Sequence, residues 1–496
     1  MIEIASLNNM IKSDKYTCEN VISSKELMFK AGKACADEIL KRYPSIKSAA
    51  IVCGKGNNAG DGYVIGGLLK DEGIEVTFYL LSSFFSSDGK YFYESAVKNG
   101  CKVQEVSSSL HFDEDVIIDC IFGTGFKGKV SELSSSVINK INNSSKDVVS
   151  IDINSGMNGD TGLGEVIVSS SLTIAINNYK PGHFLNMAKD VMKDKTVVEI
   201  GINLIDQPYY LFEEKDIKFR PRKNYSTKRD YGYVGLIGGS LNYSGAIRLA
   251  NMALCSVISG AGVVKLATIN SLAQYIIPNI LESTFYPLSE IDNHFLFNEE
   301  EISSFIKNLK VIGVGMGLTN NEETSKLIKY LLSNYDGILL IDADGLNALG
   351  DIDDKYLLNT KAKVVLTPHL YEFSRISKYS VDEINESPIA KVKEYSSKYN
   401  VVTLLKGPTT IISDGQKVYL VDKGCPGMAK GGSGDVLSGL LVGLLTEEDK
   451  ILDIVTKGAY INGLAGENAK KEYSEITMTP GDTVNCIKKI IDSYSK

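Results

Sequence analysis

A glycine-rich run at residues 54–62 is the first place where residue types and spacing point to chemistry. It reads Gly54-Lys55-Gly56-Asn57-Asn58-Ala59-Gly60-Asp61-Gly62. Glycine lets a ligand approach the backbone closely, and the free N–H groups at the start of a helix bind anions such as phosphate. Amide and carboxylate oxygens suit a hard cation or ribose hydroxyls. Four glycines, two asparagines and an aspartate in nine residues are unusual for a plain turn. The run matches neither the GxGxxG fingerprint nor a Walker A loop.

Two further aspartates follow apolar runs that read as strands. Asp119 ends one and leads into Gly123-Thr124-Gly125, and Asp152 ends another and leads into Ser155-Gly156. Ligands of open parallel sheets bind at the carboxyl ends of the strands, so we expect these residues and the glycine run to meet in one cleft. A single aspartate at such a place is more often a helix cap, but three in this arrangement favour a site.

The run from Ala429 to Gly439 is the strongest local signal in the second half of the chain. It reads AKGGSGDVLSG, so small residues open a long apolar helix. Backbone N–H groups at such a helix start bind an anion, and Asp435 lies within the first turn. A carboxylate there can take the proton from a hydroxyl that attacks a phosphoryl group. The alternative interpretation is a glycine-rich helix start in which the aspartate only complements the helix dipole.

Other polar and glycine-rich runs also follow predicted strands in this half. They are Gly238–Ala246, Gly313–Gly317, Asp342–Leu349, Thr367–Phe373 and Lys406–Thr410. A lone histidine is usually structural, but the position of His369 after a strand favours a site. Lys406 directly precedes Gly407-Pro408. This position is equally consistent with a lysine that contacts a phosphate or adenine and with a lysine that is only solvated.

Alternating strands and helices must position these runs. In the first half we expect strands at 48–53, 74–80, 115–119, 147–151, 172–176 and 196–200, and a helix from about Gly62. In the second half we expect strands at 233–237, 262–268, 309–313, 337–341, 362–366 and 401–405, then a hairpin around Asp414-Gly415 and two long helices. Strands separated by helical stretches predict parallel sheets with helices on both faces, and so two α/β domains.

The composition is that of a globular protein. Of 496 residues, 43% are hydrophobic and 23% charged, and the net charge is −8, which disfavours non-specific binding to nucleic acid or anionic membranes. No apolar run is long enough to span a bilayer, and residues 1–20 are too polar for a signal peptide. The eight cysteines form no CxxC pair, which argues against zinc ribbons and a disulfide framework. We expect a cytoplasmic homo-oligomer with no nucleic-acid or membrane partner.

Residues 1–205 resemble a known family. The motifs GxGNNxGDG, DxxFGTGFxG and DINSG are similar to those of the NAD(P)H-hydrate epimerase domain of YjeF N-terminal type. The resemblance implies a Rossmann-like three-layer sandwich that interconverts the R and S epimers of hydrated NAD(P)H. Asp152 would bind substrate and act as acid and base at the reacting carbon. Asn154 replaces the usual proline of DIPSG, so we expect less rigidity beside Asp152. Ala59 replaces a common glycine, which is a modest change.

The resemblance also assigns the ligands of this domain. A potassium ion would lie by Asn58, Asp119 and Ser155. The phosphates and ribose of the substrate would lie along two segments, which are Asn57, Asn58, Ala59, Gly60 and Asp61, and Gly123, Thr124, Gly125, Phe126, Lys127, Gly128 and Lys129.

Residues 225–496 resemble the ribokinase-like superfamily, and more narrowly the ADP/ATP-dependent NAD(P)H-hydrate dehydratase. This implies a three-layer α/β/α domain in which a nucleotide phosphorylates the S-hydrate and loss of phosphate restores NAD(P)H. The substrate would contact Ala246, Gly317, His369 and Asp435, with Asp435 as the base. The nucleotide, with magnesium on its phosphates, would lie against Lys406, Gly407, Pro408, Thr409, Thr410 and Gly434.

The two halves, joined by a linker at 206–224, therefore predict a bifunctional isomerase and lyase that repairs NADH-hydrate and NADPH-hydrate. ADP or ATP is the phosphoryl donor, and ADP would give AMP and phosphate. Two alternatives remain. A ribokinase-like vitamin or sugar kinase would keep its phosphorylated product, and a YjeF-type binding module of messenger-RNA decapping scaffolds would bind RNA.

Overall fold

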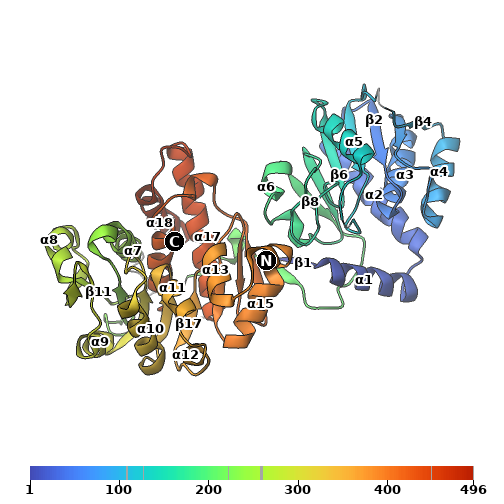
Figure 1. Ribbon diagram of the computed structural model, residues 1–496. Helices are drawn as coiled ribbons and strands as arrows, with labels where there is room; N and C mark the ends of the chain where they lie inside the picture. The colour runs from blue at the N-terminus through green and yellow to red at the C-terminus, as the bar shows by residue number, and fades with distance from the viewer. Residues whose placement is uncertain are drawn as a thin grey trace. The chain divides into compact units, whose positions relative to one another are not determined.

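The chain forms two compact units in the computed structural model, which describes residues 1–107, 110–126, 128–219, 221, 223–256, 261–447 and 450–494 (Figure 1). The N-terminal unit spans Glu3–Tyr209, and the C-terminal unit combines Met1–Ile2 with Tyr210–Lys496. The segment 206–224, predicted as a linker, contains strand β9 (Tyr209–Leu211) and the 3-10 turn Glu214–Asp216. Most of that segment therefore belongs to the C-terminal unit.

The N-terminal unit is built on a seven-stranded sheet in the order β4-β3-β2-β5-β6-β7-β8, and every neighbouring pair is parallel. Its strands are β2 (Ser48–Cys53), β3 (Glu75–Leu80), β4 (Lys102–Glu105), β5 (Val116–Cys120), β6 (Asp147–Ile151), β7 (Leu172–Ile176) and β8 (Lys195–Val198). Parallel strands need crossover connections, which the helices supply.

Helices cover both faces of this sheet. They are α1 (Leu7–Asn20), α2 (Ser24–Arg42), α3 (Asn57–Asp71), α4 (Ser87–Lys98), α5 (Glu132–Asn142) and the short α6 (Ala188–Val191). Alternate β2 residues contribute to two cores: Ile51 packs with side chains of α2, α3 and α4, and Val52 packs with side chains of α5. Since successive side chains of a strand point to opposite faces, α5 covers the face opposite α2–α4.

The C-terminal unit contains an eleven-stranded mixed sheet in the order β1-β9-β20-β19-β18-β17-β16-β15-β10-β11-β12. Its remaining strands are β1 (Ile2–Ile4), β10 (Tyr233–Ile237), β11 (Val263–Ile269), β12 (Ser283–Leu288), β15 (Leu309–Val314), β16 (Ile338–Ile341), β17 (Lys363–Leu366), β18 (Val402–Leu405), β19 (Thr410–Ser413) and β20 (Val418–Val421). In the order of the sheet, the neighbouring strands β18-β17-β16-β15-β10-β11-β12 are all parallel. Strand β19 pairs antiparallel with both β18 and β20, and β19 and β20 form the expected hairpin. Strands β13 (Glu290–Ile291) and β14 (His294–Phe295) form a separate pair.

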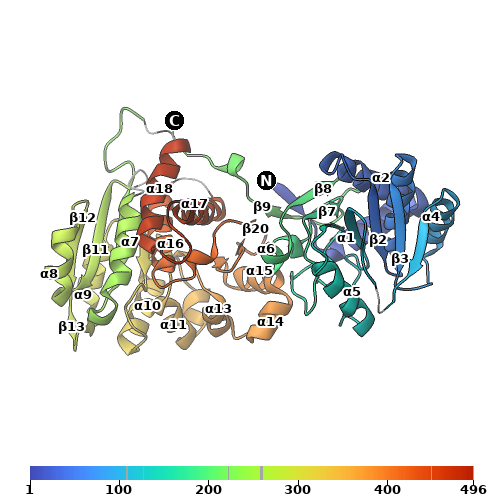
Figure 2. The ribbon, with the colours of Figure 1, turned by 90° about the horizontal axis from the view of Figure 1, so that it is seen from above.

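Two groups of helices enclose this sheet, as Figure 2 shows. One group is α7 (Ser244–Ser256), α16 (Ser433–Leu444), α17 (Ile451–Glu472) and α18 (Pro480–Tyr494). The other elements are α8 (Ala273–Ile276), α9 (Glu299–Ile306), α10 (Glu322–Asn334), α11 (Asp344–Asp351), α12 (Lys355–Leu358), α13 (Leu370–Ser377), α14 (Val381–Glu386) and α15 (Pro388–Tyr399). Val442 of α16 packs against Gly313 of β15 and lies on the same face as Leu236 of β10. Phe305 of α9 packs against Gly235, which precedes Leu236 in β10 and therefore faces the other side of the sheet. The two helices therefore cover opposite faces, which confirms the predicted three-layer α/β class.

The carboxyl ends of the parallel strands position the predicted site residues in both units. Helix α3 begins at Asn57 and not near Gly62, so the second half of the glycine run is the first turn and a half of a helix. Short 3-10 turns also follow strands, and the one at Pro181–His183 comes soon after β7. Among the described residues, no helix is long and apolar enough to cross a membrane.

Candidate active sites

A cavity of about 850 Å³ opens at the carboxyl edge of the N-terminal sheet. Nine of the predicted substrate-binding residues line it, and they are Asn57, Asn58, Asp61, Gly123, Thr124, Gly125, Phe126, Lys129 and Asp152. Ala59 is buried in the core, Gly60 lies against Met28, and Gly128 is not part of the lining. Lys127 lies outside the described residues.

The three residues predicted to hold potassium are joined in one buried network. Asp119 is fully buried, and its carboxylate accepts hydrogen bonds from the Ser155 hydroxyl (2.5 Å) and the Ser155 N–H (2.9 Å). Asn58 donates from Nδ2 to the Phe122 carbonyl oxygen (3.0 Å), which also accepts from the Ser155 hydroxyl (3.2 Å). The Asn58 Oδ1 atom is buried without a hydrogen-bond partner in the described part of the chain. Burial raises the pKa of Asp119, and the donated hydrogen bonds oppose that shift.

Asp152 lies beside a buried lysine that the sequence reasoning missed. Its Oδ1 accepts a hydrogen bond from Nζ of Lys180 (2.5 Å), whose side chain is 1% exposed, and its Oδ2 accepts one from the Thr124 N–H (3.1 Å). Burial would raise the pKa of Asp152, but the charge of Lys180 and these hydrogen bonds hold it below its ordinary value. Its position in the sequence could have identified Lys180 as a site residue, because it follows β7 as Asp152 follows β6.

Backbone strain and a histidine also fix Asp152. It has a φ of 66°, a left-handed conformation that is costly for a residue other than glycine. The His183 Nε2 atom lies 2.8 Å from the Asp152 carbonyl oxygen. Burial, together with the charge of Lys180, lowers the pKa of His183 to about 4, so at neutral pH the ring is neutral and donates this hydrogen bond.

Asn154, where we expect less rigidity than a proline would give, has four hydrogen-bond partners in the structure. Its side chain is fully buried, and Nδ2 donates to the Val168 and Val191 carbonyl oxygens (2.7 and 3.1 Å) and to the Ser170 hydroxyl (3.0 Å). Its Oδ1 accepts a hydrogen bond from the Thr173 hydroxyl (2.6 Å). The segment that proline would stiffen through its ring is held here by hydrogen bonds.

In the C-terminal unit, a charged cluster lies at the carboxyl ends of β16, β17 and β18. Lys406 Nζ lies 3.0 Å from Asp342 Oδ1 and 3.7 Å from Glu372 Oε2. The Ser438 hydroxyl of α16 donates to the other Asp342 oxygen (2.7 Å). Asp342 and Glu372 were not among the predicted site residues, although both lie in motifs that follow strands. Lys406 is therefore a paired cation and not a solvated lysine.

Asp435 lies in the first turn of α16, next to this cluster. The helix begins at Ser433, and its N-cap residue, Gly432, has a φ of 98° and provides no side-chain cap, so the first backbone N–H groups are available to an anion. A Cβ added to Gly434 would lie 3.4 Å from Lys406 Nζ, which places this helix start beside the lysine. Burial and the charge of Asp342 raise the pKa of Asp435 to about 7, and Lys406 partly opposes the shift.

The other predicted residues of this unit lie at neighbouring strand ends. Gly317, with a φ of 71°, approaches Ala246, because an added Cβ would lie 3.1 Å from the Ala246 Cβ. His369 is the N-cap of α13 and accepts hydrogen bonds from two backbone N–H groups, and its Nε2 lies 3.4 Å from Glu372. Burial and Lys406 lower the pKa of His369. The segment from Gly407 to Thr410 leads from β18 into β19, and Thr409 donates to Asp422 (3.1 Å).

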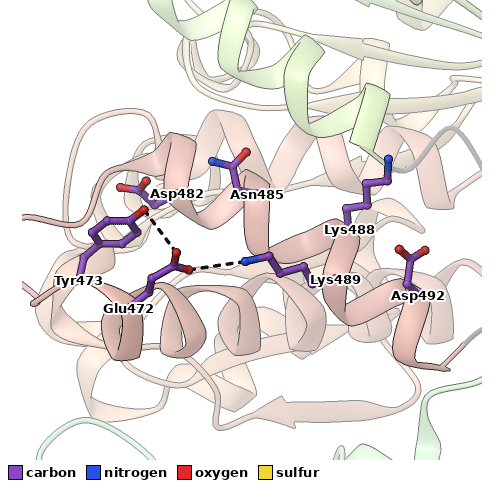
Figure 3. Close-up of a pocket in the computed structure, with 7 residues that line it drawn as sticks. All are labelled: Glu472, Tyr473, Asp482, Asn485, Lys488, Lys489 and Asp492. Carbon is purple, nitrogen blue, oxygen red and sulfur yellow. Dashed lines mark hydrogen bonds and ion pairs between the residues drawn. The ribbon is translucent and has the colours of Figure 1, made fainter.

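A separate hollow of about 440 Å³ lies between α17 and α18 (Figure 3). Charged and polar side chains line it, and Lys489 Nζ lies 3.6 Å from Glu472 Oε2. None of the predicted site residues lines it. We assign it no part in the chemistry.

Two family models match the sequence. The YjeF-related protein N-terminus matches residues 24–182, and NAD(P)H-hydrate dehydratase matches residues 234–489. A bifunctional NAD(P)H-hydrate repair enzyme of Thermofilum pendens is 31% identical over 99% of this chain and 96% of its own length. The enzyme of the same description from Moorella thermoacetica is 31% identical over 95% of this chain and 93% of its own.

Solved structures resemble the C-terminal part of the chain. A ribokinase-like superfamily protein from Enterococcus faecalis has a TM-score of 0.50 and 23% identity, and the match covers 59% of this chain and 99% of that one. At this identity the likeness shows the fold alone. The near full-length relatives, which contain both halves, favour the repair enzyme over the kinase and scaffold alternatives.

Proposed function

Since the chain belongs to the family of bifunctional NAD(P)H-hydrate repair enzymes, we propose that each unit carries one of the two activities at the site described above. The N-terminal site epimerises R- and S-NAD(P)H-hydrate, and the C-terminal site dehydrates the S epimer with a nucleotide. The carrying observation is that a predicted catalytic aspartate lies beside a lysine at the carboxyl edge of each sheet: Asp152 beside the buried Lys180, and Asp435 beside the partly buried Lys406.

In the N-terminal site, Asp152 acts at the reacting carbon of the hydrate, and the start of α3 and the segment from Gly123 to Lys129 bind the phosphates and ribose. One cavity large enough for a dinucleotide portion is lined by Asn57, Asn58 and Asp61 of α3 and by Gly123, Thr124, Gly125, Phe126 and Lys129, which supports the assignment. The Thr124 N–H and Lys180 keep the Asp152 carboxylate ionised and oriented.

A potassium ion fits the residues assigned to it. Asn58 Oδ1 is a buried acceptor without a partner among the described residues, and Asp119 and Ser155 add carboxylate and hydroxyl oxygens. Oxygen donors of this kind suit a hard cation. When bound, the ion would supply positive charge near the substrate phosphates. Asn58, Asp119 and Ser155 would hold it.

In the C-terminal site, Asp435 takes the proton from the hydroxyl of the S-hydrate as that oxygen attacks a phosphoryl group. Hydroxide is a poor leaving group and phosphate a good one, so phosphorylation makes loss of the hydroxyl easy. Ala246, Gly317 and His369 bind the hydrate beside Asp435. This arrangement is supported by the approach of Gly317 to Ala246 and by the raised pKa of Asp435.

ADP or ATP is the phosphoryl donor and lies along Lys406, Gly407, Pro408, Thr409 and Thr410, with Gly434 at its phosphates. The uncapped start of α16 and the cation of Lys406 fit an anionic group. Magnesium would be held by the phosphate oxygens of the nucleotide, since the described residues contain no group of three histidine, cysteine or carboxylate side chains placed to bind a metal. It would neutralise phosphate charge.

Two further points complete the proposal: the enzyme acts in the cytoplasm, and it acts as a homo-oligomer. Light scattering of the purified chain tests the second point. A mass equal to that of one chain would contradict it.

The test of the function is an absorbance assay of the restored dihydronicotinamide ring. Purified protein is mixed with R- and S-NADPH-hydrate, magnesium, potassium and either ADP or ATP. We expect complete conversion of both epimers, and replacement of potassium by lithium should slow only the R epimer. Conversion of the S part alone would contradict the epimerase assignment. No conversion with either nucleotide would contradict the dehydratase assignment.

A further inference from the structure

The chemistry of epimerisation requires both a proton donor and a proton acceptor, and the proposed function names only Asp152. Hydration of the dihydronicotinamide ring places the hydroxyl on the carbon next to the ring nitrogen. The nitrogen lone pair can expel this hydroxyl as water when an acid protonates it, which breaks the C–O bond and forms a C=N⁺ bond. Water then adds to the opposite face, the C–O bond forms again, the lone pair returns to nitrogen, and a base takes the released proton.

Asp152 is held in the form that accepts a proton. Its Oδ1 lies 2.5 Å from the Lys180 ammonium, which is itself buried, and its Oδ2 accepts the Thr124 N–H. Both partners donate to the carboxylate and stabilise its ionised form. The donor must therefore be sought elsewhere on the cavity wall.

Asp61 is the one other buried carboxyl among the described residues that line the cavity. It is 8% exposed and projects from the second turn of α3. No hydrogen bond or ion pair joins its carboxyl to another described residue. The Asp152 carboxylate, in contrast, accepts hydrogen bonds from Lys180 and from the Thr124 N–H. A buried carboxyl without a cation or a donor is more stable protonated than ionised.

The remaining acids of the cavity are less suited to the role. Asp14 lies on the exposed side of α1, and Asp88 already accepts a hydrogen bond from the Ser24 hydroxyl (2.6 Å). Among the described lining residues there is no histidine.

We propose that Asp61 is the proton donor of the N-terminal site, and that it protonates the leaving hydroxyl of the hydrate while the Asp152 carboxylate receives the proton of the incoming water. The proposal rests on the proposed epimerase function of this site. In the reverse direction the two carboxyls exchange roles, as microscopic reversibility requires, and solvent returns the proton between turnovers. Burial, with the charges of Asp152 and Asp14, raises the pKa of Asp61 well above its ordinary value, and Lys180 opposes this.

The groups that face Asp61 come from five elements. They are Asp14 of α1, Cys35 of α2, Cys120 of β5, Asp152 after β6 and Lys180 after β7. Burial raises the pKa of both thiols, so Cys35 and Cys120 stay neutral and add no charge. Asp152 and Asp14 favour the protonated form of Asp61, and Lys180 is the single cation in this group.

The test compares Asp61→Asn with wild-type full-length protein in the epimerisation of R-NADPH-hydrate, with no nucleotide present. We expect kcat to fall roughly 10²- to 10⁴-fold, the range for loss of a general acid, while KM changes less than about threefold. Asp61→Glu should recover part of the rate, and Asp71→Asn, at the exposed C-terminal end of the same helix and outside the cavity lining, is the matched control with wild-type kcat. A kcat of Asp61→Asn within threefold of wild type would overturn the proposal, and so would a loss that appears only in KM.

A labelling measurement keeps the proposal testable if Asp61→Asn does not fold. In water enriched in ¹⁸O, wild-type protein should place one ¹⁸O atom in the hydrate for each inversion, because the C–O bond breaks. Inversion without ¹⁸O uptake would overturn the proposal. A wild-type protein that inverts neither epimer faster than buffer would instead contradict the epimerase function itself, so the two failures are distinguishable.

Discussion

Individual carboxylates in the two sites have opposite electrostatic surroundings. Asp152 is paired with a buried lysine that it contacts directly, whereas Asp435 shares Lys406 with Asp342 and Glu372. One cation for several carboxylates leaves Asp435 with net repulsion, and burial adds to it. The ionised fraction of Asp435 therefore changes within the physiological pH range, and that of Asp152 does not.

The dehydratase activity should consequently depend on pH near neutrality. Burial and Asp342 raise the pKa of Asp435 to about 7, and only the ionised form can accept the substrate proton. We expect kcat/KM for S-NADPH-hydrate to rise about tenfold per pH unit below 7 and to level off above it. Asp344 also raises the pKa of Asp435, so Asp344→Asn should shift the rising part of this pH profile to lower pH. A flat profile from pH 5.5 to 8 would contradict the role of Asp435.

The sequence predicts the residues of the sites better than their partners. Asp119, Asp152 and Asp435 stand out because each is a carboxylate at a strand end or helix start. Lys180 does not, and Asp342, although it also follows a strand, is not distinguished from other strand-end residues, since the pairing that makes each of them important joins residues 28 and 64 positions apart in the chain. Asn154 shows the same limit, because its four hydrogen-bond partners come from residues 168 to 191.

At the scale of elements, the order of strands and helices follows from the apolar runs, but helix starts do not. Helix α3 begins at Asn57, and just before it Gly54 lies against Ile121, the residue that follows β5. An added Cβ at Gly54 would overlap the Ile121 carbonyl oxygen, a contact that no sequence pattern reveals. The glycine run therefore has two parts, a close approach of strands and the first turns of a helix.

A second close approach, between α7 and α16, gives a stability prediction. A Cβ at Gly439 of α16 would overlap the Ala250 carbonyl oxygen of α7, so Gly439→Ala must push the two helices apart. Overpacking of this kind costs about 1–3 kcal/mol. We expect the midpoint of urea unfolding of the C-terminal unit to fall, together with the dehydratase rate, because α16 carries Asp435.

The control for this prediction is Gly245→Ala in α7. Nothing lies within 4 Å of an added Cβ at Gly245, which is exposed in the first turn of the helix. Alanine is the better helix former by roughly 1 kcal/mol, so the unfolding midpoint should be unchanged or higher. Equal destabilisation by both substitutions would show that the close approach of α7 and α16 does not cause the loss of stability in Gly439→Ala.

At the scale of the whole molecule, two α/β domains follow from composition, motifs and alternation, but the path of the chain between them does not. Residues Met1–Ile2 belong with the C-terminal unit, where the Met1 amino group pairs with Asp216 (2.7 Å). Segment 206–224 lacks a long apolar run, yet β9 within it pairs with β20. Strands of three residues are too short to be recognised from a periodic pattern.

Because each compact unit contains its own sheet and its own proposed catalytic aspartate, two inactive variants should complement each other. Asp152→Asn should dehydrate the S epimer and leave the R epimer, and Asp435→Asn should epimerise without restoring NADPH. A mixture of the two proteins should convert both epimers completely, since S-hydrate released by one chain can reach the C-terminal site of another. The measurement is the final absorbance of restored NADPH, compared with each variant alone. If the mixture restores no more NADPH than Asp152→Asn alone, there are two explanations. Either the S-hydrate does not leave the chain that forms it, or Asp435→Asn has also lost the epimerase activity. An epimerisation assay of Asp435→Asn alone separates these two outcomes.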